Sequence, residues 1–107
     1  MRYDEIVEKL LEEEGVEEST MMKTLRLRYE GDFIAMMFER EAALIIKVSP
    51  QRVDELVADG RGLEFKFTKK RFKEWVLIPL EYEDEYESFI YESLAYAQRK
   101  KLPARSR

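Results

Sequence analysis

The chain has 107 residues, 45% apolar and 39% charged, which is enough for one hydrophobic core beneath an ion-rich surface. Its 19 basic and 23 acidic residues give a net charge of −4, which argues against the whole chain binding polyanions. It has no cysteine and no histidine, which excludes disulfides, thiolate nucleophiles, zinc-finger and iron–sulfur sites, and the commonest general base.

The N-terminal segment is predicted to form an amphipathic helix. Its apolar residues recur at the 3.6-residue helical period and share one face. These residues are Tyr3, Ile6, Val7, Leu10 and Leu11. Gly15 follows three glutamates where a glycine commonly ends a helix, so the chain is expected to leave the helix there.

Three strands are expected next. From Thr24 the apolar residues alternate with arginines, which is the two-residue period of a half-buried strand. A turn at 30–32 separates it from two apolar stretches, 33–38 and 42–48, which predict further strands. The short connections favour hairpins, so the three strands are expected to form an antiparallel meander.

A second helix is expected to start at Ser49, because the serine hydroxyl can cap it and Pro50 suits the first helical position. Its inner face is predicted to carry Val53, Leu56 and Val57, and the glycines at 60 and 62 are expected to end it.

The rest of the chain predicts two strands and a last helix. The strands are expected at 64–67 and 74–79, around a basic turn at 68–73. The helix is expected from Asp84, with acids at its start and bases at its end, and Pro103 stops it.

These elements predict an α+β fold in two layers, with a five-stranded antiparallel sheet and the order α-βββ-α-ββ-α. Residues 1–102 are expected to form a single domain, and 103–107 a frayed tail. No stretch has the length of a membrane span, and no signal-type segment opens the chain, so a cytoplasmic location is expected. The absence of asparagine, beside abundant charged residues, is a feature of some thermophile proteins.

Three segments resemble the TfoX N-terminal-domain family and its MmcQ/YjbR-like relatives. Residues 48–62 read Val-Ser-Pro-Gln-Arg-Val-Asp-Glu-Leu-Val-Ala-Asp-Gly-Arg-Gly, and residues 73–76 read Lys-Glu-Trp-Val. Residues 15–22 fall where the family enters its first strand, with Lys23 in place of a family glycine. The resemblance implies a two-layer fold similar to that of secretion chaperones and supplies no catalytic residues. DNA binding has been proposed for the MmcQ/YjbR-like relatives.

The predicted basic turn is the candidate nucleic-acid site, because cations can contact phosphates and a neighbouring aromatic ring can stack on a base. The cations of this candidate site are Lys66, Lys69, Lys70, Arg71 and Lys73. The structural alternative is an ordinary charged hairpin whose Phe65 and Phe67 face the core. Both interpretations stay open.

No metal, cofactor or catalytic site is predicted. The acids at 81–87 lack the EF-hand pattern and suit the start of a helix, whose dipole favours negative charge. The chain also has no serine nucleophile elbow, phosphate-binding loop or dinucleotide fingerprint, so it is not expected to be an enzyme.

The last helix carries tyrosines on more than one face. Tyr91 is expected near the rim, where it suits either a homodimer contact or ordinary boundary packing. The leading hypothesis is therefore a binding or regulatory module that acts through protein contacts, with a partner that the sequence does not identify. Nucleic-acid binding through the basic hairpin is the alternative.

Overall fold

A computed structural model describes residues 2–21, 24–38, 43–67 and 70–100. Within these ranges, six strands form one antiparallel sheet, accompanied by three α-helices and a 3-10 segment. The elements in chain order are α1 (Arg2–Leu10), β1 (Val16–Met21), β2 (Thr24–Tyr29), β3 (Asp32–Phe38), β4 (Ala43–Lys47), α2 (Pro50–Asp59), β5 (Leu63–Phe67), β6 (Lys70–Pro79), η2 (Leu80–Glu85) and α3 (Tyr86–Lys100).

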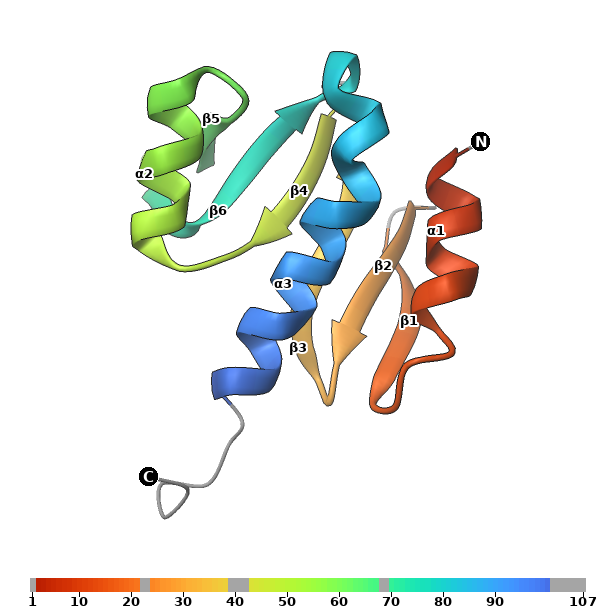
Figure 1. Ribbon diagram of the computed structural model, residues 1–107. Coiled ribbons are helices and arrows are strands. Elements are labelled where there is room, and N and C mark those ends of the chain that lie inside the picture. The colour runs from red at the N-terminus through yellow and green to blue at the C-terminus, as the bar shows by residue number, and fades with distance from the viewer. Residues whose placement is uncertain (1, 22–23, 39–42, 68–69, 101–107) are drawn as a thin grey trace.

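The sheet has the strand order β1-β2-β3-β4-β6-β5, and every neighbouring pair is antiparallel. Strands β1 to β4 form a meander. The chain then passes through α2 to β5 at the far edge and returns as β6, which pairs with β4. The three helices lie on the same side of the sheet, with α3 running across its middle (Figure 1).

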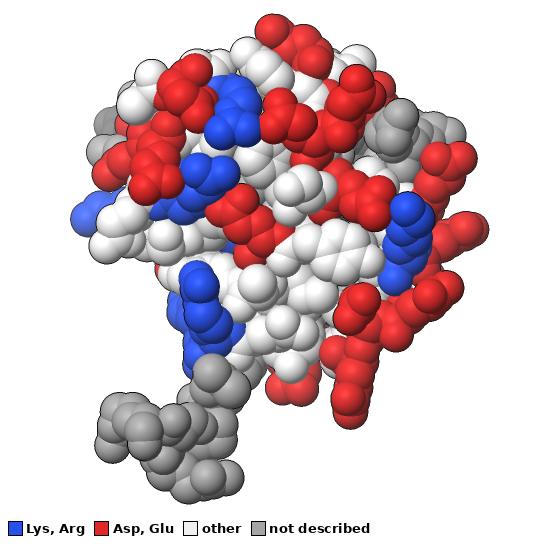
Figure 2. Space-filling view, in the orientation of Figure 1, with Lys and Arg blue, Asp and Glu red and all other residues white. Residues whose placement is uncertain are grey.

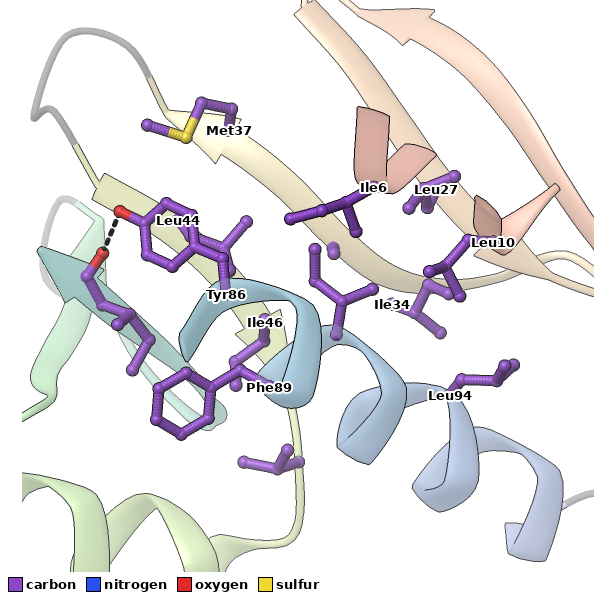
Figure 3. Close-up of a cluster of buried hydrophobic side chains, with 14 of the residues drawn as sticks. Ile6, Leu10, Leu27, Ile34, Met37, Leu44, Ile46, Tyr86, Phe89 and Leu94 are labelled. Carbon is purple, nitrogen blue, oxygen red and sulfur yellow. Dashed lines mark hydrogen bonds between the residues drawn. The ribbon is translucent and has the colours of Figure 1, made fainter. Parts of the chain in front are cut away.

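The hydrophobic core lies between this helical layer and one face of the sheet. Leu27, Ile46 and Val76 project from the strands into a cluster that also contains Ile6 of α1 and Ile90 of α3. Figure 3 shows side chains of this cluster arranged between the sheet and the helices. The periodicity that predicted the first helix therefore identifies its buried face correctly.

The α+β class and the antiparallel sheet are confirmed, but the prediction of five strands is wrong. The additional strand is β1, which lies at the edge of the sheet and, among the described residues, pairs with β2 alone. Its sequence, VEESTM, lacks a regular alternation of apolar residues, so no periodic signal marks it. Cross-strand pairs hold it instead: Arg28 forms an ion pair with Glu17 at 3.3 Å, and Arg26 Nε donates to Ser19 Oγ at 3.3 Å.

Three predicted boundaries also need correction. The first helix ends at Leu10, and Gly15, with φ of 87°, instead serves the turn into β1, where its carbonyl accepts from Glu30 N–H. Strand β6 begins at Lys70, so the backbone of the predicted turn is largely strand. The last helix begins at Tyr86, because the residues before it form the 3-10 segment.

Helix α2 has the predicted ends. The Ser49 hydroxyl accepts a hydrogen bond from Arg52 N–H at 3.2 Å, which caps the first turn. Gly60 ends the helix in the left-handed conformation, with φ of 91°. Gly62 then passes close to the core: a Cβ there would lie 2.6 Å from a methyl carbon of Val76. This close approach brings the end of α2 against β6.

Two hydroxyls anchor the last helix on the sheet. Tyr86 donates to the carbonyl of Ile78 at 2.8 Å (Figure 3), and burial raises the pKa of Tyr86 to about 12. Ser93 is fully buried, and its hydroxyl lies 2.8 Å from the carbonyl oxygen of Ile34 and 2.6 Å from that of Lys47. Because Ser93 has one hydroxyl hydrogen, the two carbonyls share it.

We expect Ser93→Ala to lower the free energy of unfolding by about 1–3 kcal/mol, because it removes the hydroxyl donor from one buried and one partly buried carbonyl. Urea denaturation measures the change. Ser88→Ala is the matched control, since Ser88 is exposed on the same helix, and we expect an effect within about 0.5 kcal/mol. Equal effects of the two substitutions would contradict an anchoring role for the Ser93 hydroxyl.

Candidate functional site

The candidate site is the face of the sheet that the helices do not cover. Successive residues of a strand point to opposite faces, so residues that neighbour the core positions point away from the helices. One row on this outer face crosses five strands, as paired Cα positions show: Arg26, Met36, Ile45, Leu77 and Leu63. We call this surface the outer face.

The outer face is rich in large apolar side chains. We define the apolar strip as Phe33, Met36, Ile45, Phe65, Trp75 and Leu77, which lie on β3, β4, β5 and β6. Phe65 and Ile45 are buried, yet neither belongs to the cluster beneath the helices. Both faces of β3 and β4 are thus apolar. The unbroken apolar runs in their sequences are the signal that could have revealed this.

An aromatic cluster occupies one part of the strip. The ring of Trp75 on β6 stacks on Phe33 of β3, with centroids 4.7 Å apart and planes inclined by 29°. Phe65 of the edge strand lies on Trp75 at 5.3 Å, tilted by 47°. The tryptophan is thus held between two phenylalanines. One of the two sequence interpretations has Phe65 facing the core. Phe65 is buried, but it packs on Trp75 at the outer face and not in the cluster beneath the helices.

The strip is only partly closed to solvent. Ile45 at its centre is 1% exposed, whereas Met36 and Leu77 beside it are half-buried. At the edge of the sheet Leu63 is 55% exposed, the largest exposure among the large apolar residues of the described ranges. A collection of large apolar side chains on one surface is typical of an interaction site.

Basic side chains accompany the strip. We define the basic arc as Arg26 and Arg28 on β2, Lys47 at the end of β4, and Lys73 near the start of β6. Lys73 forms no ion pair with any residue that the structure describes. Lys47 forms no close ion pair there either, but its positive charge lies near enough to Glu74 to lower the pKa of that carboxyl. Arg28 is paired with Glu17, which reduces the local excess of positive charge by one.

The two layers differ in charge. The helices and the 3-10 segment contain 12 acidic and 5 basic residues, whereas the six strands contain 5 acidic and 7 basic residues. Figure 2 shows the consequence on the helical side, where most of the charged side chains in view are acidic and surround an uncharged central area. The fold therefore separates an acidic helical face from a less acidic sheet.

The predicted nucleic-acid site is only partly described. Its backbone forms a hairpin, in which Lys66 pairs with Arg71 and Phe67 pairs with Lys70. Lys69 lies outside the described residues, as do the side chains of Lys66, Lys70 and Arg71. Lys73 lies within β6 and is exposed. The arrangement of these five cations as a site stays a prediction.

The acids of the helical side form ion pairs between helices. Arg52 of α2 contacts Glu92 of α3 at 2.6 Å, and Lys9 of α1 contacts Glu87 of α3 at 3.2 Å. Both pairs fasten a flanking helix to α3. Among the described residues, no three carboxylates come close enough together to hold a metal ion.

Arg61 joins the end of α2 to the acidic 3-10 segment. It contacts Asp59 at 2.9 Å and Glu85 at 2.7 Å. Hydrogen bonds from Arg61 lower the pKa of the Asp59 carboxyl, and hydrogen bonds to Asp59 and Glu85 raise the pKa of the guanidinium. Two carboxylates of the acidic segment 81–87, Glu85 and Glu87, thus have cationic partners, Arg61 and Lys9.

Two further surfaces give weaker candidates. Tyr91, the predicted dimer contact, is half-buried and packs against the core cluster. A shallow depression near the end of α3, beside Lys47 and Tyr96, has no enclosed space for a water molecule.

No helix in the described ranges is long and apolar enough to cross a membrane.

Glu74 links strand β6 to the last helix. The Tyr96 hydroxyl donates to Glu74 Oε2, and Lys100 Nζ lies 3.3 Å from the same oxygen. Burial alone raises the pKa of the Glu74 carboxyl, but these two partners, together with the nearby charge of Lys47, outweigh burial and hold that pKa below its usual value of 4.5. The ionised carboxylate therefore stabilises the folded state.

We expect this stabilisation to be complete above pH 4.5 and to disappear as the pH falls through the lowered pKa of Glu74. Urea denaturation between pH 7 and about pH 3 should show that the stability lost in Glu74→Gln shrinks toward the acid end. Tyr96→Phe, which keeps the carboxylate and removes one donor, should reproduce part of this pH dependence. A difference between wild type and Glu74→Gln that stays constant over this range would contradict the assignment.

No known protein-family model matches the chain, and no curated protein matches it at significant similarity. The candidate site is therefore defined by its own geometry.

Proposed function

We propose that the chain is a non-enzymatic binding module, similar to the TfoX N-terminal domain, that acts through protein contacts at the outer face. The observation that carries the proposal is the apolar strip on a sheet face without helices. An α+β layer normally buries its apolar sheet face against another element. Here Met36 and Leu77 stay partly exposed, so a partner protein would remove them from water.

The composition of the strip favours protein over nucleic acid. The Trp75 ring already lies between Phe33 and Phe65, so it offers less open surface on which a base could stack. The strip also contains Met36 and Leu77, which suit apolar side chains of a protein partner.

The resemblance to the TfoX N-terminal domain is consistent with this proposal. Two segments that carry it, residues 48–62 and 73–76, are separated in sequence but pack together, since Gly62 lies directly against Val76. Trp75 of the second segment forms the centre of the aromatic cluster. In this proposal the segments maintain the fold and its outer face, and no catalytic role is assigned to them.

Site-specific photo-crosslinking in cells tests the proposed function. Leu63 and Leu80 are both exposed large apolar residues, at 55% and 43%, but Leu63 borders the strip and Leu80 lies on the 3-10 segment. A photoreactive phenylalanine at position 63 should form discrete protein adducts, and the same group at position 80 should not. The absence of protein adducts at position 63, with the variant folded by circular dichroism, would refute contacts at the outer face.

Nucleic-acid binding is the second candidate, because the antiparallel pairing of Lys66 with Arg71 places a basic segment in a hairpin. Such a hairpin could extend along a groove of a duplex or beside a single strand. Exposed Lys73 would add a cation at its base on β6.

If this second candidate is correct, the chain should retain DNA or RNA at low salt. Substituting Lys69, Lys70 and Arg71 together by glutamine should weaken binding and reduce the slope of log K against log salt by about 2–3. Arg99→Gln is the control, because it removes a positive charge outside the hairpin by the same kind of substitution. No retention at any salt concentration would remove this candidate.

A further inference from the structure

We propose that the partner of the outer face is an amphipathic helix whose apolar stripe is bordered by Asp and Glu residues. This inference rests on the proposed function, since it names the chemistry of the partner that would cover the apolar strip. It follows from the charge around the strip, from the width of the strip, and from the charge repulsion that a second copy of the chain would meet there.

Charge complementarity identifies the partner as acidic. Four cations of the basic arc accompany the strip. Arg28 is paired with Glu17, and Arg26 donates a hydrogen bond to Ser19. Lys73 is exposed and has no ion-pair partner among the described residues, and Lys47 is partly exposed, with Glu74 as its acidic neighbour. Carboxylates placed beside these cations would gain attraction and would speed association.

The sheet geometry suits one helix. The arc reaches from β2 to β6, which are three strand spacings apart in the order of the sheet, or about 14 Å. A helix with its side chains is about 10–12 Å across. One helix lying over β3 and β4 would therefore cover Met36 and Ile45 and bring its borders near the cations. On the opposite face, α3 already packs over the same two strands.

The same charges disfavour a second copy of the chain. Two outer faces packed against each other would bring their basic arcs together, which is repulsive. Packing the outer face of one copy on the acidic helical face of the next would make a head-to-tail contact that does not close by itself. A partner helix with acidic borders would meet no repulsion from the basic arc and would not produce an open head-to-tail chain.

The experiment uses the full chain and two synthetic peptides of 18 residues. The first carries leucines at helical spacing, with glutamates at every bordering position. The second replaces each glutamate by lysine. Trp75 is the only tryptophan of the chain and lies in the strip, so its fluorescence reports directly on the occupied face. We expect the acidic peptide to bind saturably, to shift the Trp75 emission to the blue, and to bind at least tenfold more tightly than the basic peptide at low salt.

Variants of the arc and the strip locate the binding. Lys47→Glu combined with Lys73→Glu should weaken binding of the acidic peptide by about tenfold or more and should reverse the preference between the peptides. Leu77→Glu places a charge inside the strip and should abolish binding of both peptides. Arg99 is an exposed cation on α3, away from the outer face. Arg99→Glu makes the same kind of charge change there and should leave the affinity for both peptides unchanged. Lys73 is exposed and Lys47 is partly exposed, so the double variant of these lysines is expected to fold. It keeps the test decisive if Leu77→Glu does not fold.

Several results would overturn this inference. Equal affinity for the two peptides, or no binding of the acidic one, excludes an acidic helix as the partner. A concentration-dependent dimer by light scattering that shifts Trp75 emission without peptide assigns the face to a second copy. A Trp75 shift with oligothymidylate, but not with the acidic peptide, assigns it to nucleic acid. Protein adducts at position 63 together with failed peptide binding would reject only the acidic helix, whereas loss of those adducts would reject the proposed function itself.

Discussion

The Ser93 hydroxyl connects three parts of the fold through one buried group. It joins α3 to the carbonyls of Ile34 and Lys47, which lie on neighbouring strands. Helix α3 is in turn the element to which α1 and α2 are fastened, through Glu87 and Glu92. The position of α3 on the sheet therefore bears on both flanking helices, while α2 also packs directly on β6. The buried hydroxyl restricts the position of α3 more closely than apolar packing alone would.

Placing all three helices on one side determines the character of both surfaces. The helical side receives most of the acidic residues, while the opposite side keeps the apolar strip and the basic arc. A polar outer face would have left the chain without an evident contact surface. Because Phe33 and Trp75 instead form a stacked pair there, the side without helices is the part of the molecule best suited to a partner.

Periodicity was sufficient for elements whose two faces differ. Tyr3 and Ile6 reveal the first helix, and Ser49 with Gly60 marks both ends of the second. Periodicity did not reveal β1, because that strand is held by its pairing with β2. An isolated sequence does not show that Glu17 lies opposite Arg28. The outer face was missed for a related reason: its residues become one surface only when β3, β4 and β6 are placed side by side.

The charged edge of the sheet has a consequence of its own. Strand β1 leaves one side of its backbone without a neighbouring strand among the described residues, and such an edge can recruit strands from other molecules. Glu17 and Glu18 are exposed on this strand, and their charges repel the same edge of another copy. The residues that hide β1 from recognition in the sequence thus protect the sheet from growing into an aggregate.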